Sequence, residues 1–164
     1  VLDAVRRIVG LARDRALVIV NDRADLALLS GADGVHLGDE DLPVPEARRL
    51  LGPDRLVGRT CRTLEEARTA IDEGADHVGF GPIFASRTKR LGIPVRGLEA
   101  LREVAAALGA PVVAISGIDL SNVAGVARAG AACAAVVDAI FGTGDPEVNA
   151  ARLAAAFEAG RRRP

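Results

Sequence analysis

The sequence contains no tryptophan, tyrosine or methionine, and four phenylalanines are its only large aromatic residues. Proteins that bind nucleic acids by base stacking need aromatic side chains, so this scarcity argues against a nucleic-acid partner. Two cysteines, Cys61 and Cys133, are too few and too far apart for a disulfide scaffold or a metal cluster. We therefore expect a protein of the reducing cytoplasm, with Cys133 as a small core residue.

Long apolar runs and an excess of one charge are also missing. No run reaches the roughly 18 residues of a membrane span, and no signal peptide is visible. The net charge is −1 with acidic and basic residues intermixed, which implies no strong attraction to membranes or nucleic acid. The basic run at the end of the sequence predicts a solvated tail over 161–164 after a single domain over 1–160.

Hydrophobic residues make up 49% of the sequence and gather in short aliphatic runs. Six such runs predict β-strands, and the amphipathic patterns between them predict helices. The predicted strands cover residues 16–20, 34–37, 55–59, 77–81, 111–116 and 131–137. The predicted helices cover residues 1–14, 22–30, 43–51, 63–74, 96–108, 120–129 and 146–160.

Strands that alternate with helices favour a parallel sheet, either doubly wound or closed into a (β/α)₈ barrel. No Gly-x-Gly-x-x-Gly follows the first strand, which disfavours the dinucleotide-binding doubly wound sheet. A barrel needs eight strands and usually at least roughly 200 residues, whereas this chain has six predicted strands and 164 residues. We predict an incomplete TIM (β/α)₈ barrel whose open edges favour a homo-oligomer.

Two acidic residues follow the first two predicted strands. Asp22 comes directly after the first, and Asp41 follows the second within the segment "GVHLGDED". If these strands are neighbours, both carboxylates lie on one rim, where hard oxygen ligands suit Mg²⁺. Either residue alone is explained equally well as a helix cap. Together, and with the basic segment "ASRTKR" opposite, they favour a metal site.

Other predicted strand ends carry groups that suit phosphates. The segment 85–90 combines cations with hydroxyls, which fits a polyphosphate, although a solvated loop is the ordinary alternative. Ser116-Gly117 and Val137-Asp138 each follow a strand, and such turns either bind phosphate through backbone N–H groups or only connect elements. His36 either faces the barrel mouth or packs there, and His77, inside a predicted strand, is expected to be structural.

The segments "VNDRADLAL", "GVHLGDEDL", "VGRTCRT", "VGFGPIFASRTKRLG" and "AISGI", in this order, resemble the thiamine-phosphate synthase and TenI superfamily over about residues 15–145. The resemblance is closer to the synthase. It implies a transferase of thiamine biosynthesis that joins hydroxymethylpyrimidine diphosphate to hydroxyethylthiazole phosphate and releases pyrophosphate. Small phosphorylated substrates are the partners that it implies, with Mg²⁺ as cofactor.

The resemblance also implies a role for each matching position. Mg²⁺ would be held by Asp22 and Asp41. The diphosphate would be bound by Asn21, Thr60 and Lys89, of which Asn21 and Lys89 are the candidate catalytic residues, and His36 would lie beside the pyrimidine. The thiazole phosphate would be bound by Ser86, Arg87, Thr88, Gly117, Val137 and Asp138. Departure of the stabilised diphosphate would leave a pyrimidine carbocation for the thiazole nitrogen to capture, without a general base.

The sequence departs from the family pattern at three places. The family's Gln-x-Arg-x-Lys motif is missing, Asp138 replaces a Ser, and Arg62 replaces the His to which the resemblance assigns proton transfer in TenI. Arg cannot shuttle a proton at neutral pH, which favours the synthase over the tautomerase. A TenI-type thiazole tautomerase and a non-catalytic phosphate-binding remnant are the alternatives to the transferase.

Overall fold

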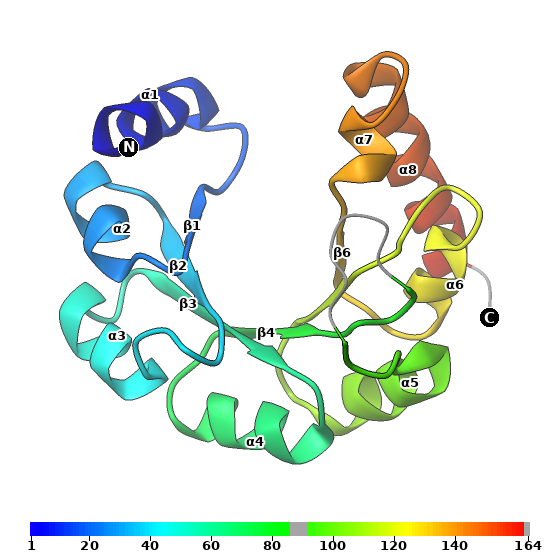
Figure 1. Cartoon of the computed structure of the whole chain (residues 1–164), viewed down its shortest axis with the longest axis horizontal. Coiled ribbons are helices and arrows are strands. Elements are labelled where there is room, and N and C mark those ends of the chain that lie inside the picture. Colours follow the sequence, from blue (N-terminus) through cyan, green and yellow to red (C-terminus); the bar gives the residue numbers. More distant parts are fainter. Residues whose placement is uncertain (86–91, 163–164) are drawn as a thin grey trace. The chain divides into compact units, whose positions relative to one another are not determined.

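The structure is a computed structural model and describes residues 1–85 and 92–162, in which strands and helices alternate along the chain (Figure 1). The strands are β1 (Ile19–Asn21), β2 (Gly34–Leu37), β3 (Leu56–Cys61), β4 (His77–Phe80), β5 (Val112–Ile115) and β6 (Cys133–Ala135). The helices are α1 (Leu2–Ala12), α2 (Ala24–Ser30), α3 (Val44–Leu51), α4 (Leu64–Asp72), α5 (Gly97–Ala107), α6 (Val123–Arg128), α7 (Asp138–Phe141) and α8 (Pro146–Arg161).

The strands follow one another in the sheet in the order β1-β2-β3-β4-β5-β6. Parallel pairing sets Asn21 opposite His36, and His36 opposite Gly58, so the carboxyl ends of β1, β2 and β3 lie at one edge. The same parallel pairing joins β5 to β6. This topology confirms the predicted fold class, six βα units of a TIM-type barrel with parallel strands.

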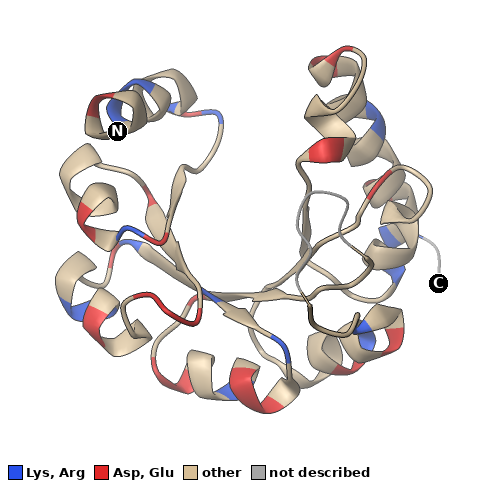
Figure 2. Cartoon of the chain, viewed as in Figure 1, with Lys and Arg blue, Asp and Glu red and all other residues tan. Residues whose placement is uncertain are grey.

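The chain divides into two compact units, one formed by residues 1–60 and 68–78 and the other by 61–67 and 79–164. We call them the amino-terminal and the carboxy-terminal unit. Acidic and basic residues are interspersed along the helices of each unit, in agreement with the mixed charge of the sequence (Figure 2). None of the described helices is long and apolar enough to cross a membrane.

The core of the amino-terminal unit lies on one face of β2 and β3. Val35, Leu37 and Val57 are fully buried on this face, and α2 and α3 add small and aliphatic side chains such as Ala27 and Ala47. Because successive strand residues point to opposite faces, His36 projects to the other face, where it is only half-buried. The strand pattern thus separates the packed face from the face that carries polar groups.

The carboxy-terminal unit is built around β5, with Val112 and Ala114 buried together with Phe80 and Leu101. The expectation that Cys133 belongs to the core is wrong, because its side chain is exposed in β6, the last strand in the sheet order. Among the described strands, β6 has a neighbouring strand on one side only. Its first residue, Cys133, is therefore less buried than the apolar sequence around it suggests.

Candidate active site

The first part of the site is the end of β1. Asp22 has a left-handed backbone conformation (φ +66°), which Asp and Asn tolerate better than most residues. Its backbone N–H donates to the carbonyl oxygen of His36 at 2.8 Å, which fixes the residue against the neighbouring strand. Asn21 Nδ2 donates to Asp22 Oδ1 at 2.6 Å. The sequence-predicted pair therefore acts as one hydrogen-bonded unit beside β2.

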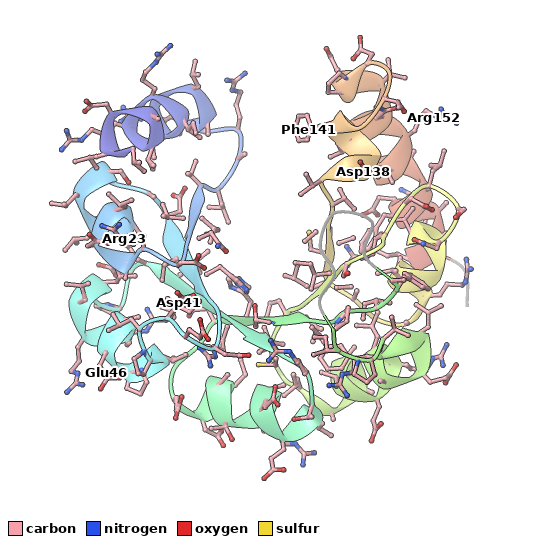
Figure 3. The ribbon with its side chains drawn as sticks, viewed as in Figure 1. Arg23, Asp41, Glu46, Asp138, Phe141 and Arg152 are labelled. Atoms are coloured by element: carbon pink, nitrogen blue, oxygen red, sulfur yellow. The ribbon has the colours of Figure 1, made fainter. Side chains whose placement is uncertain are left out.

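The second part is the loop that follows β2 and carries Asp41, which is labelled in Figure 3. Asp41 Oδ2 accepts a hydrogen bond of 2.6 Å from the backbone N–H of Gly38. Arg59, from β3, donates to the carbonyl oxygen of Gly38 and lies 3.6 Å from Asp39 Oδ1. The sequence reasoning missed Arg59, although an arginine within a largely apolar strand, two positions before the strand end, is a usable signal of a polar partner.

The chemistry of the two carboxylates fits Mg²⁺. Asp22 and Asp41 follow two adjacent strands, and carboxylate oxygens are the ligands that this ion prefers. A hydrogen bond holds the backbone N–H of Asp22, and another holds the carboxylate of Asp41. Among residues 1–85 and 92–162 no group of three His, Cys, Asp or Glu side chains could enclose a metal ion. Two carboxylates suffice for Mg²⁺, since it keeps several waters and shares substrate phosphates.

A chain of polar contacts crosses β2, β3 and β4 in the amino-terminal unit. His36 Nε2 lies 2.9 Å from Thr60 Oγ1, and His36 Nδ1 lies 3.4 Å from His77 Nε2. Burial, the neighbouring His77 and the charge of Arg59 lower the pKa of His36 to about 4, against the opposing effect of Asp41. Burial also lowers the pKa of His77. Both imidazoles are therefore neutral at neutral pH.

Gly58 makes room for this chain of contacts. A β-carbon at position 58 would lie 2.1 Å from His77 Nε2 and 2.6 Å from His36 Nδ1, closer than atoms can approach. The expectation that His77 is only structural missed this contact with His36. The signal was Gly58 itself, because a glycine inside a strand often marks the close approach of another group.

In the carboxy-terminal unit, Ser116 and Gly117 follow β5 with φ values of +84° and +63°. A β-carbon at Gly117 would lie 2.5 Å from the carbonyl oxygen of Ala85 and 2.7 Å from Phe84 Cβ. Ser116 Oγ donates to the carbonyl oxygen of Phe84 at 3.2 Å. In return, the backbone N–H of Phe84 donates to the carbonyl oxygen of Ser116, also at 3.2 Å. Only glycine fits this close backbone packing at position 117.

Val137 and Asp138 stand where β6 leads into α7. Asp138 is the first residue of α7 and is exposed, as is Val137. A β-carbon at Gly142 would lie 2.7 Å from Asp138 Oδ1, so the carboxylate lies over the next turn of its own helix. Figure 3 labels Asp138 beside Phe141 on the same short helix. The remaining predicted site residues, Ser86, Arg87, Thr88 and Lys89, lie outside the described residues.

Carboxylates and hydroxyls follow strands of one unit, and glycine-dependent backbone follows a strand of the other. Barrel proteins carry their active sites at these carboxyl ends of the strands, so the fold and the position of these groups define a protein of the barrel class. Residues 1–140 match the family model described as thiamine monophosphate synthase. The thiamine-phosphate synthase of Anaeromyxobacter dehalogenans is 76% identical over 161 residues, which are 98% of this chain and 72% of that protein. The thiamine-phosphate synthase of Myxococcus xanthus is 54% identical over 89% of this chain and 67% of that protein.

A solved structure agrees with these relatives. The thiamine phosphate pyrophosphorylase from Pyrococcus furiosus superposes with a TM-score of 0.89 at 35% identity, covering 97% of this chain and 76% of that one. The chain belongs to the thiamine monophosphate synthase family. The predicted resemblance is confirmed, and with it the assignment to the transferases of thiamine biosynthesis.

Proposed function

We propose that the chain joins hydroxymethylpyrimidine diphosphate to hydroxyethylthiazole phosphate and releases pyrophosphate, using Mg²⁺. The observation that carries this proposal is the pair of hydrogen-bonded carboxylates of Asp22 and Asp41, which lie in the segments that follow two adjacent strands in a chain of this family. The relatives are named thiamine-phosphate synthase, which supports thiamine phosphate as the product. The hydrogen-bonded geometry supports the use of a divalent cation.

In the amino-terminal unit, Asp22 and Asp41 would hold Mg²⁺, and the bound ion would neutralise the charge that develops on the departing diphosphate. Asn21, which already donates to Asp22, would use its amide to orient the same diphosphate. Thr60 presents a hydroxyl in contact with His36, and we assign it to a diphosphate oxygen. The half-buried, neutral ring of His36 offers a flat surface for the pyrimidine without adding a positive charge beside Mg²⁺.

In the carboxy-terminal unit, the backbone at Gly117 and at the Val137-Asp138 turn would bind the thiazole phosphate. The left-handed conformation and close packing at Gly117 hold this backbone in one place, which suits the recognition of an anion by N–H groups. Lys89 is assigned to the diphosphate, and Ser86, Arg87 and Thr88 to the thiazole phosphate, from the family resemblance.

This reaction needs stabilisation of a leaving group and alignment of two substrates, and no proton has to be removed by a side chain. A neutral His36 with a pKa of about 4 is consistent with this requirement. Arg62 cannot replace a proton-shuttling histidine, because a guanidinium keeps its proton at neutral pH. The synthase reaction is therefore favoured over thiazole tautomerisation.

A direct assay tests the proposal. The purified chain is incubated with both substrates and Mg²⁺, and thiamine phosphate and pyrophosphate are quantified, with the Anaeromyxobacter dehalogenans relative in parallel. We expect both products in equal amounts and their loss on chelation by EDTA. No turnover by this chain beside an active relative would overturn the proposed activity, and tautomerisation without coupling would support the isomerase instead.

Two coarser expectations accompany the activity. We propose that the protein acts in the cytoplasm, where two cysteines without a disulfide remain reduced. We also propose self-association through β1 and β6, each of which has a neighbour on one side only in the order of the described strands. Sedimentation velocity at several concentrations tests the association, and a monomer throughout would contradict it.

A further inference from the structure

The contact between His36 and His77 restricts where the hydrogens of the two rings can lie. Nitrogen faces nitrogen at 3.4 Å, and the rings are inclined by 28° with their centroids 5.5 Å apart. Between two such nitrogens only one hydrogen fits, so one ring donates and the other accepts. The identity of the donor then decides which nitrogen of His36 faces Thr60 with a hydrogen.

Only two arrangements satisfy all three groups. In the first, His77 Nε2–H donates to His36 Nδ1, His36 Nε2–H donates to Thr60 Oγ1, and the hydroxyl hydrogen of Thr60 points elsewhere. In the second, every hydrogen bond is reversed and Thr60 donates to His36. The first arrangement carries a hydrogen on Nε2 of both rings, and the second carries it on Nδ1 of both.

We infer that His77 is a positioning residue, which donates to His36 and so leaves the hydroxyl hydrogen of Thr60 available to an anionic oxygen. An acceptor-only anion beside Thr60 can be bound by the hydroxyl in the first arrangement and is repelled by its lone pairs in the second. Gly58 supports the contact on which this assignment depends, because its missing side chain is what permits the two rings to meet.

This inference rests on the proposed function only for the identity of the anion, a diphosphate. The hydrogen-bond direction is a property of the chain without ligand and can be measured separately. The chain has only two histidines, so removing one ring assigns the signals of the other. A uniformly ¹⁵N-labelled chain and a long-range ¹H–¹⁵N spectrum of the imidazoles therefore report the tautomer of each ring.

We expect both rings of the unsubstituted chain to carry hydrogen on Nε2, with and without inorganic pyrophosphate and Mg²⁺. In His77→Phe, which removes the donor, His36 should show a mixture of tautomers. His77→Gln, whose amide can still donate, should restore the Nε2–H form. Hydrogen on Nδ1 of both rings in the unsubstituted chain, or a tautomer of His36 that is unchanged in His77→Phe, would overturn the inference.

Binding of pyrophosphate, measured by calorimetry with Mg²⁺, gives the second readout. Thr60→Val should bind about tenfold more weakly, as expected for a lost hydrogen bond to a charged group, and His77→Phe about fivefold more weakly. The double variant should bind no more weakly than Thr60→Val, since His77 acts through Thr60. If the two losses of affinity multiplied in the double variant, His77 would not act through Thr60 and the inference would be wrong. If the unsubstituted chain bound no pyrophosphate, the proposed function would be contradicted, and the measured tautomers alone would test the inference.

Discussion

In the amino-terminal unit, the described site residues are side chains in contact with one another, such as Asn21 with Asp22 and His36 with Thr60. In the carboxy-terminal unit, the corresponding position after β5 is backbone packed against backbone, with Gly117 too close to Ala85 to carry a β-carbon. The amino-terminal unit thus presents polar side chains near the carboxyl ends of its strands, and the carboxy-terminal unit presents a closely packed backbone.

The two units should therefore tolerate different substitutions. An exposed carboxylate such as Asp22 can lose its charge with little effect on packing, because its neighbours are polar groups at a strand end. A side chain added at Gly117 must displace the backbone of the preceding loop. We expect substitutions in the first unit to change activity without stability, and substitutions in the second to change both.

The largest expected effect is that of Asp22→Asn on turnover. Asparagine accepts the left-handed conformation of this residue, so the backbone can stay in place while one negative charge is lost. We expect the rate of product formation to fall about 100-fold or more, with the free energy of unfolding changed by less than about 0.5 kcal/mol. Steady-state kinetics and urea unfolding of the same preparation measure both.

The matched control for this change is Asp25→Asn, three residues along the chain. Asp25 forms an exposed ion pair of 2.6 Å with Arg23, and hydrogen bonding to Arg23 lowers the pKa of Asp25 to about 2. Its loss should leave turnover and its dependence on Mg²⁺ unchanged. Equal losses of activity in both variants would show that general acidity of the surface, and not a metal ligand, governs the reaction.

The contrast between the units also explains what the sequence could and could not predict. Strand periodicity and spacing placed Asp22 and Asp41 after the first two strands, which the structure shows to be neighbours, because a short parallel βα unit has little freedom in its connections. The predicted strand 34–37 agrees with β2, while the others shift at their ends, and Thr60 lies within β3 and not after it. Element ends depend on tertiary contacts that a local pattern does not contain.

The sequence analysis missed tertiary contacts between residues that are far apart in the sequence. The partnership of His36 with His77 joins residues on two strands that are not neighbours in the sheet order, and it needs the glycine between them. The contact of Arg59 with the carbonyl oxygen of Gly38 likewise joins a strand to a loop before it. Sequence spacing indicates which strand ends meet, but it does not tell which side chains bridge them.

The second largest effect is expected in the carboxy-terminal unit, for Gly117→Ala. The φ of +63° and the approach of 2.5 Å to the carbonyl oxygen of Ala85 both oppose a β-carbon. We expect the free energy of unfolding to fall by about 2 kcal/mol or more, together with weaker binding of the thiazole phosphate. Chemical unfolding and calorimetry measure the two effects.

Gly109→Ala is the control for this substitution, since it adds the same methyl group in the same unit. A β-carbon at Gly109 meets no atom within 4 Å, and this residue does not have a positive φ. Stability and phosphate binding should both remain as in the unsubstituted chain. If Gly117→Ala behaved like Gly109→Ala, the strand end after β5 would not be the rigid backbone site that distinguishes this unit.

A smaller effect is expected from acid on the amino-terminal unit. The pKa of His36 is lowered to about 4 in the folded chain from an ordinary 6.5, so the unfolded chain binds the proton more readily. Stability should therefore decrease as the pH falls from 7 toward 4, by at most about 2 kcal/mol between pH 7 and 5. Urea unfolding of His36→Gln, which cannot titrate there, should show a smaller loss, and an equal loss in both chains would contradict the assignment.

The smallest effect is expected for Asp138, the one charged residue among the described site residues of the carboxy-terminal unit. Asp138 is exposed, and its carboxylate lies over Gly142 in its own helix, so solvent screens it from a phosphate bound at the Val137-Asp138 turn. Asp138→Ser should tighten thiazole phosphate binding by only about threefold at low salt. The gain should vanish at high ionic strength, where calorimetry should give equal affinities. A gain of a hundredfold would place the carboxylate against the phosphate, and weaker binding would make Asp138 part of the site.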